Sequence, residues 1–419
     1  MTPASLHVLK NGVRVVLAPC EAESVAFGLF VASGSRHEDA KSAGISHFIE
    51  HMLFKGTPSR KPVDITRAIE GRGGNFNACT SEESTCYYAH LPSEYLAEAV
   101  EILSDMYLNA SIPPDEFARE KQVVVEEIRM YSDEPDVVAA ENLQRALFPD
   151  NALGAPVAGT PESLAPMTPD TLRRYMRSHY LPGNTVAVVA GSFDESAALA
   201  LVELYLGGLR RKAKPFSPEP VDFGRQPAGS VTATKDINQT QLAIGYRTFG
   251  VNDERRYAAT VMDAVLGRGM SSRLFQEVRE RRGLSYDISS RMQFFTDAGM
   301  LTITAGLDGS RLDMATRTID RELARLRDRR VGAQELRRTK EFLIGNFRLS
   351  HEKVTSKMFF YGSTMLSFGC LVTPQDQIEK ISSVTAAEIQ SVACDILRPE
   401  CRCTSIVTPR GADPGHAVI

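Results

Sequence analysis

The chain of 419 residues is 43% hydrophobic and 24% charged, with a net charge of −4 at pH 7; this is the balance of a globular protein and excludes a disordered chain. Its length is too great for one ordinary core and predicts two to four domains. The small negative charge gives no general electrostatic reason to bind nucleic acid, and no apolar run approaches the about 18 residues that cross a bilayer. We therefore expect no nucleic-acid partner and no membrane insertion.

The first predicted elements are a strand, a turn at Asn11-Gly12 and a second strand within residues 1–19, because Asn-Gly is a strong hairpin signal. This stretch has no basic region followed by an apolar one, so we expect neither a signal nor a transit peptide and a cytoplasmic location. The seven cysteines include no Cys-x-x-Cys pair, which favours reduced thiols in a reducing compartment. A nucleophile made of Cys86 and His90 is an alternative without a supporting motif.

Further along the chain, short strand-like runs alternate with longer amphipathic runs, and this pattern predicts a mixture of sheet and helix. The runs TCYYAHL and TVAVVAGSF predict strands in the first half, and QLAIGYRTF and MLTITAGL predict strands in the second. Helices are expected at residues 93–109, 114–132, 168–179, 195–207, 254–266, 271–282, 310–328 and 333–349.

The two halves of the chain are similar at a coarse level. The stretch ESVAFGLFVASGSRHEDAKSAGISHFIEHMLF has the pattern strand, turn, helix, and QTQLAIGYRTFGVNDERRYAATVMDAVLG repeats it. Between the halves, residues 210–229 are rich in proline, glycine and charge and predict a linker. We therefore predict an α+β fold with two similar domains, residues 1–209 and 230–419, related by internal duplication. Each is expected to be a mainly antiparallel sheet with helices packed on it.

The stretch AGISHFIEHMLFKGT, residues 43–57, places His47, Glu50 and His51 within five positions of one another. On a helical wheel its apolar residues form one buried stripe, and the two histidines lie together on another side. Side chains four apart on a helix have Cβ atoms about 5–6 Å apart, so both imidazoles can reach one metal ion. The spacing His-x-x-Glu-His is the inverse of a known zinc motif, and it favours a metal site over a solvated polar face.

A catalytic zinc usually takes three protein ligands and leaves a fourth position to water, so a third ligand must come from elsewhere in the chain. The helical stretch DEFAREKQVVVEEIRMYSDEPD is the best source. Glu120 and Glu127 share a face beside its apolar stripe, whereas Glu126 lies on the outer face. The residues themselves leave either Glu120 or Glu127 as the ligand, with the other as its support, and predict a solvated Glu126.

With these residues the chain resembles the inverted-zincin metallopeptidases, the family of pitrilysin, insulin-degrading enzyme and mitochondrial processing peptidase. The resemblance covers nearly the whole chain, and its size is most similar to the short bacterial members and the processing-peptidase β-type subunits. It implies one Zn²⁺ per chain, held by His47, His51 and Glu127. It also implies that Glu120 supports the ligands and that Glu50 is the general base of peptide-bond hydrolysis.

Two further segments extend the resemblance. The run GGNFNACTSEESTCYYAHL is similar to the family's Asn-Ala-x-Thr edge strand, which implies that Asn77, Ala78 and Cys79 lie along the backbone of a peptide substrate. An ordinary internal hairpin is the alternative. The run GRGMSSRLFQEVRERRGLSYDISS is similar to the family segment with an Arg/Tyr pair, which implies Arg279 and Tyr286 as hydrogen-bond donors to a polarised carbonyl oxygen.

The resemblance implies a zinc-dependent endopeptidase whose catalytic domain is residues 1–209, while residues 230–419 carry the Arg/Tyr pair and no metal. Because the chain resembles one half of the family's longer enzymes, it also implies a dimer that encloses a chamber for extended peptides. A homodimer is our first expectation, and a heterodimer with a related subunit is the second. The alternatives are a non-catalytic or partner subunit of a peptidase-like heterodimer and a metal-dependent hydrolase of small-molecule amides.

Overall fold

The computed structural model describes residues 3–210, 217–224 and 227–410. The chain divides into two compact units: the first contains Met1–Ile128, Ala155–Pro218 and Arg348–Thr373, and the second contains Arg129–Gly154, Glu219–Phe347 and Pro374–Ile419. This division differs from a single boundary at residues 210–229, because residues 129–154 belong to the second unit and residues 348–373 to the first. Within the expected linker, residues 211–216 and 225–226 lie outside the described residues.

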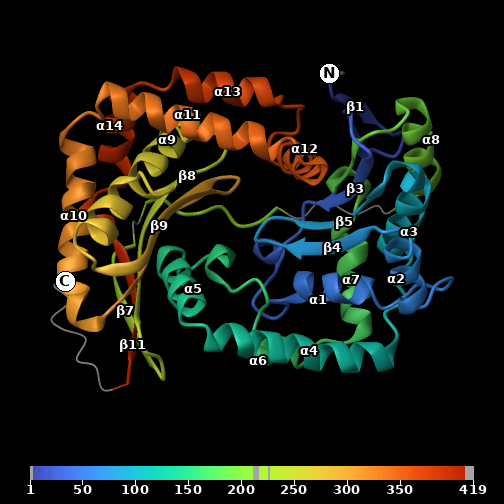
Figure 1. Cartoon of the computed structure of the whole chain (residues 1–419). Coiled ribbons are helices and arrows are strands. Elements are labelled where there is room, and N and C mark those ends of the chain that lie inside the picture. The colour runs from blue at the N-terminus through green and yellow to red at the C-terminus, as the bar shows by residue number, and fades with distance from the viewer. Residues whose placement is uncertain (1–2, 211–216, 225–226, 411–419) are drawn as a thin grey trace. The chain divides into compact units, whose positions relative to one another are not determined.

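The central sheet of the first unit consists of β1 (Ser5–Val8), β2 (Arg14–Pro19), β3 (Ser24–Val31), β4 (Asn75–Thr80), β5 (Thr85–Pro92) and β6 (Thr185–Gly191). Its strand order is β1-β2-β6-β3-β5-β4. Figure 1 labels β1, β3, β4 and β5 of this sheet. β2 and β6 are parallel, the other neighbours are antiparallel, and β4 lies at an edge. The predicted turn between the first two strands is confirmed: Gly12 has φ +98° and its N–H donates to the carbonyl of Leu9 at 2.8 Å.

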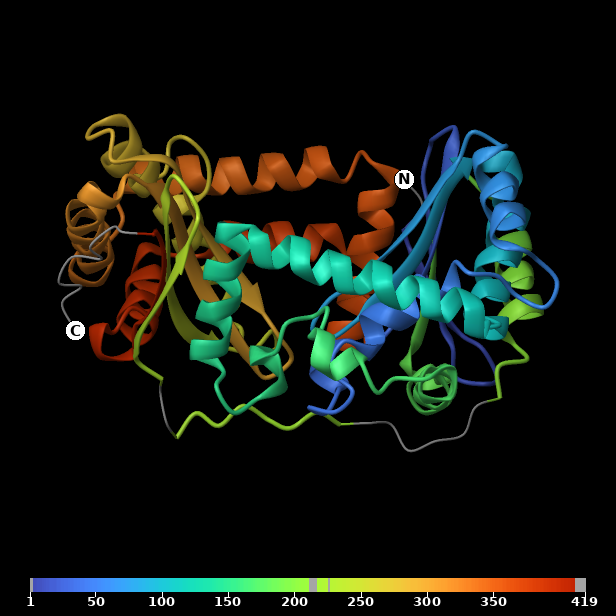
Figure 2. The same cartoon turned by 90° about the horizontal axis from the view of Figure 1, so that it is seen from below.

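The helices of the first unit are α1 (Ile45–Leu53), α2 (Pro62–Glu70), α3 (Leu96–Asn109), most of α4 (Pro114–Asp133), α6 (Pro161–Leu164), α7 (Pro169–His179), α8 (Glu195–Leu206) and α12 (Val354–Phe368). One face of the sheet packs against α1, α3, α7 and α8, and α3 and α8 lie side by side there (Figure 2). The other face packs against α12. Gly28 on β3 allows this approach, because a Cβ at that position would lie 2.7 Å from Sδ of Met358.

The second unit has a five-stranded sheet built from β7 (Gly229–Lys235), β8 (Thr240–Phe249), β9 (Ser285–Phe294), β10 (Ala298–Leu307) and β11 (Cys403–Pro409). Its order is β7-β11-β8-β10-β9. One face packs against α5 (Pro135–Leu147). The remaining helices of this unit are α9 (Arg256–Gly267), a π-helix at Phe275–Glu280, α10 (Leu312–Asp328), most of α11 (Ala333–Ser350), α13 (Pro374–Ser383) and α14 (Ala386–Ile396).

The two units have the same topology. The order β2-β6-β3-β5-β4 corresponds strand by strand to β7-β11-β8-β10-β9, and in each unit the first pair is parallel while the others are antiparallel. α1 and α9 each follow the corresponding strand, β3 and β8. The predicted α+β fold of two similar domains, related by duplication, is therefore confirmed. Short 3₁₀ turns complete the elements at Ser35–His37, Ser93–Tyr95, Ala152–Gly154, Pro182–Asn184, Gly309–Arg311 and Pro399–Cys401.

Two general features bear on function. Among the described residues, no helix combines the length and apolar character needed to cross a membrane. All seven cysteines are free thiols. The Cys86 thiol is buried, and burial raises its pKa well above the ordinary value, whereas a nucleophilic cysteine needs a lowered pKa.

Candidate metal centre

The metal motif lies on α1, the helix that its apolar stripe predicts. Ile45, Phe48, Ile49, Met52 and Leu53 are each no more than 1% exposed and face the core. The side chains of the motif's two histidines and glutamate are only partly buried, and the two imidazole ring centroids lie 4.7 Å apart. The core therefore fixes the rotation of the helix and leaves both imidazoles on the same open side.

The N-terminus of α1 is held by a residue that the motif did not predict. The Glu38 carboxylate accepts hydrogen bonds from the backbone N–H groups of Gly44 at 2.6 Å and Ser46 at 2.7 Å. Burial raises the pKa of Glu38 to about 7 in spite of these donors. Gly44 has φ +90°, and a Cβ there would lie 2.5 Å from the carbonyl oxygen of Ala158, so this helix start requires glycine.

Three predicted ligands come together between α1 and α4. Oε2 of Glu127 lies 3.3 Å from Nε2 of His51 and 3.8 Å from Nε2 of His47. All three can place a ligand atom within 4.8 Å of the others, and no other such cluster of three occurs in the part of the chain that the structure describes. Ligands of a tetrahedral zinc, at about 2.0–2.1 Å from the ion, are about 3.3 Å apart. Two imidazoles and one carboxylate at this spacing therefore fit zinc.

Glu120 lies beside the ligands rather than among them. Its Oε1 contacts Nδ1 of His51 at 2.8 Å, and its Oε2 accepts from Nζ of Lys55 at 2.6 Å. Although burial opposes ionisation, hydrogen bonds to His51 and Lys55 lower the pKa of Glu120. A carboxylate that accepts from Nδ1 leaves Nε2 free to bind a metal. This geometry is consistent with a supporting role for Glu120 and a ligand role for Glu127. Glu126 is exposed, as predicted.

Burial favours the neutral form of the His47 imidazole. Burial, followed by the proximity of His51, lowers the pKa of His47 to about 4, and neutral imidazole is the form that binds metal ions. Its Nδ1 is buried and has no hydrogen-bond partner among the described residues. The other ring nitrogen, Nε2, faces Glu127, so this ring also presents Nε2 to the candidate ion.

Glu50 lies on the same turn of α1 as the ligands but is not one of them. Burial raises its pKa, although a hydrogen bond from Thr80 acts in the opposite direction. The hydroxyl of Thr80, at the end of β4, donates to Oε2 of Glu50 at 2.5 Å. A carboxylate with a raised pKa beside a metal site has the properties of a general base.

The edge strand β4 has backbone groups available for pairing. Just beyond the end of β4, the Ser81 N–H donates to the Ser84 carbonyl at 2.8 Å. Along an antiparallel ladder, hydrogen-bonded pairs of opposite residues alternate with pairs that are not hydrogen-bonded. By this alternation the backbones of Asn77 and Cys79 pair with β5. The N–H and C=O groups of Ala78 point outward, and its N–H is covered by Oδ1 of Asn77 at 2.8 Å. Of the three residues predicted along the substrate, Ala78 is thus the one that offers backbone groups at the edge.

Arg279 and Tyr286 lie in the second unit, on the π-helix and at the start of β9. The Arg279 guanidinium lies 5.4 Å from the centroid of the Tyr286 ring, and Tyr286 is 78% exposed. The neighbouring Arg281 and Arg282 both pair with Glu277. Among these three arginines, Arg279 is the one that lies beside the exposed tyrosine.

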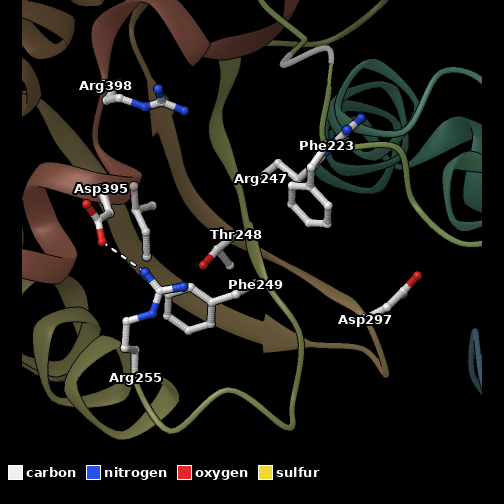
Figure 3. Close-up of a pocket in the computed structure, with 9 residues that line it drawn as sticks. Phe223, Arg247, Thr248, Phe249, Arg255, Asp297, Asp395 and Arg398 are labelled. Carbon is white, nitrogen blue, oxygen red and sulfur yellow. Dashed lines mark hydrogen bonds and ion pairs between the residues drawn. The ribbon is translucent and has the colours of Figure 1, made fainter.

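A separate pocket of about 310 Å³ in the second unit is rich in arginine (Figure 3). Cζ of Arg255 lies 4.5 Å from the centroid of the Phe249 ring, and Nη1 of Arg255 lies 3.0 Å from Oδ2 of Asp395. Arg247 donates to the backbone carbonyl of Leu147 at 2.9 Å. The guanidinium groups of Arg247 and Arg255 are thus engaged by groups of the protein itself. The pocket contains none of the predicted site residues.

The chain is similar in sequence and in structure to known proteins. Residues 14–161 match the family model described as Insulinase (Peptidase family M16), and residues 166–343 match the one described as Peptidase M16 inactive domain. An uncharacterized zinc protease of Bacillus subtilis, YmxG, is 36% identical over 97% of this chain and 99% of its own. A protease from Helicobacter pylori has a similar structure, with a TM-score of 0.92 and 20% identity over 97% of this chain and 99% of its own. An M16 inactive-domain structure from Pseudomonas fluorescens gives a TM-score of 0.90 at 19% identity over 98% of this chain and 100% of its own. The chain therefore belongs to the insulinase family of peptidases, M16.

Proposed function

We propose that this protein is a zinc-dependent endopeptidase that cleaves extended, unstructured peptides and binds one zinc ion per chain. The observation that carries the proposal is the convergence of His47, His51 and Glu127, with Glu50 on the same helical turn. The names of relatives such as the Bacillus subtilis zinc protease support it. Among the family's alternatives, a non-catalytic subunit would have no need for a complete ligand set with a base beside it.

In the proposed reaction, a zinc ion held by His47, His51 and Glu127 would supply Lewis acidity, which would lower the pKa of the attacking water from about 15.7 toward 7. Glu50 accepts the proton of the attacking water on its carboxylate and later delivers it to the amine of the leaving fragment. Glu120 keeps Nδ1 of His51 hydrogen-bonded and so fixes the orientation of that ring. Arg279 and Tyr286 keep the role that the family resemblance implies, donation to the carbonyl oxygen as it gains negative charge.

The proposed substrate is a peptide in extended conformation, because the open edge of β4 offers backbone groups with which an extended main chain can pair. A peptide that adds to this edge pairs through its main chain, so it is held whatever its side chains are. Ala78 supplies the outward groups, and Asn77 must release the N–H of Ala78 when the peptide binds. This mode favours unfolded peptides over folded proteins.

The proposal is tested with an internally quenched peptide and with metal analysis of the purified protein. We expect cleavage that a chelator abolishes and added zinc restores, and about one zinc per chain. Glu50→Gln should retain its zinc while turnover falls by about 10²–10⁴-fold. Glu126→Gln, an exposed carboxylate on α4, is the matched control and should cleave at the wild-type rate. Full activity in Glu50→Gln would refute the assignment of the base. Zinc binding without cleavage by the wild type would favour the non-catalytic subunit.

A further inference from the structure

The hydrogen bond between Thr80 and Glu50 joins the edge strand to the helix that carries the metal ligands. Thr80 is the last residue of β4, and its hydroxyl donates to Oε2 of Glu50 at 2.5 Å. Oε2 is thereby occupied, whereas Oε1 makes no hydrogen bond to any described residue. The contact distinguishes two oxygens that are chemically equivalent in a free carboxylate.

The second unit contains the same contact at the corresponding positions. The stretch EHMLFKG, which begins in α1 and runs past its end, corresponds to DAVLGRG, which begins in α9 and runs past its end. This correspondence places Asp263 where the first unit has Glu50. Ser290 is the sixth residue of β9, as Thr80 is the sixth of β4. The hydroxyl of Ser290 donates to Oδ1 of Asp263 at 2.6 Å. The pairing of a helix carboxylate with a hydroxyl on the edge strand is thus a property of the duplicated fold.

The two copies differ in what else the carboxylate contacts. Asp263 is fully buried, and its Oδ2 also accepts from Nε of Arg268 at 2.5 Å and from the backbone N–H of Met292 at 3.2 Å. Both of its oxygens are therefore occupied. At the positions of the two histidines, α9 has Thr260 and Ala264. Only in the first unit does the pair leave one carboxylate oxygen open, and there it lies beside a metal site.

We propose that Thr80 is a positioning residue for the general base: by holding Oε2 of Glu50, it directs Oε1 toward the position of the reacting water. This inference rests on the proposed function. Because Thr80 is part of the edge strand that would pair with the peptide, the base is oriented by the same element that holds the substrate. A freely rotating carboxylate would lose part of its rate, since reaction requires the proton-accepting oxygen to be in place beforehand.

Thr80→Val tests the proposal because it removes the hydroxyl and keeps the branched shape of the side chain. We expect kcat to fall by about 10–100-fold, as is usual when a supporting hydrogen bond is removed from a metal site, while KM and zinc content stay near wild type. Thr80→Ser should restore kcat because it restores the donor.

Ser290→Ala is the matched control: it removes the corresponding bond from Asp263, so it should lower the thermal stability and leave kcat unchanged. Thr80→Ala provides a second variant without the hydroxyl.

A high-resolution crystal structure of zinc-loaded Thr80→Val gives a readout that does not depend on activity. We expect the Glu50 side chain to occupy more than one rotamer, and a single rotamer identical to wild type would overturn the proposal. Wild-type kcat in both hydroxyl-free variants, or a Thr80→Ser enzyme as slow as Thr80→Val, would also overturn it. If the wild type cleaves no peptide, the proposed function fails, and the rotamers of Glu50 still decide the positioning role of Thr80.

Discussion

Glu120 and Glu127 are seven positions apart on one helix face, yet their carboxylates have different surroundings. Glu120 is only 7% exposed, and its carboxylate contacts Nδ1 of His51 and Nζ of Lys55. It therefore places a negative charge next to these two nitrogen atoms. Glu127 places an oxygen near Nε2 of both histidines. A positively charged Lys55 beside Glu120 keeps that carboxylate ionised, and an ionised acceptor makes the imidazole of His51 a better electron donor.

This difference predicts different effects of two substitutions on zinc affinity. Glu120→Gln should lower the affinity by about 10–100-fold, because it removes a charged acceptor but no ligand. Glu127→Gln should lower it further, because it removes a ligand, whereas the exposed Glu126→Gln should leave it unchanged. Competition with a fluorescent zinc chelator measures all three. A Glu120→Gln protein that binds zinc as tightly as Glu126→Gln would show that Glu120 has no supporting role.

At the scale of single residues, spacing along one helix was enough to predict some of the site. The helical period predicts His47, Glu50 and His51 as one cluster. It also places Glu120 and Glu127 on one helix face and so limits the third ligand to these two residues. The choice between these two required the structure or the family resemblance, since both lie at the same angle. Glu38, Lys55 and Thr80 were not predicted, because each acts through a partner whose position is set by tertiary packing.

At the scale of elements, the edge strand β4 connects the proposed substrate to the base. Its inward backbone groups complete the ladder with β5, and its outward groups are available for a further strand. Residues whose backbone groups point toward β5 alternate with residues whose groups point outward. A proline therefore has different consequences at adjacent positions. It removes either a group that a peptide would use or a group that the sheet itself needs.

Ala78→Pro and Cys79→Pro form a matched pair that tests this arrangement. Ala78→Pro removes an outward N–H, so we expect the fold to be retained and KM for peptides to rise by about tenfold, which corresponds to roughly one hydrogen bond. Cys79→Pro removes an inward N–H, so we expect a loss of about 1–3 kcal/mol in the free energy of unfolding. Thermal unfolding and peptide kinetics measure the two effects. An unchanged KM in a folded Ala78→Pro protein would argue against pairing at this edge.

Most elements could be predicted because their hydrophobic period is regular. The expected helices at residues 93–109, 114–132 and 333–349 correspond closely to α3, α4 and α11. The expected helix at 271–282 contains a π-helix at Phe275–Glu280, and the wider hydrogen-bond pattern of that turn has no distinct sequence period. α5 and α12 were not among the expected helices, although each covers one face of a sheet.

At the scale of the whole molecule, we propose a homodimer that encloses the site, with a heterodimer as the second choice. Light scattering of the purified, zinc-loaded chain should give twice the mass of one chain. A dimer of this kind should cleave an unfolded protein much faster than the same protein in its folded state. A stable monomer with full peptidase activity, or equal rates on folded and unfolded substrate, would contradict the enclosed chamber.

The exchange of residues 129–154 and 348–373 between the two units has a consequence for any attempt to divide this protein. A fragment that stops within residues 210–229 lacks α12, so Phe30 and its apolar neighbours on one side of its sheet would be left in water. The complementary fragment lacks α5 and would leave Ala243 and Met300 uncovered in the same way. Each half therefore contains a helix that covers the sheet of the other half and lacks the helix that covers its own. We expect soluble protein only when both halves are produced in the same cell.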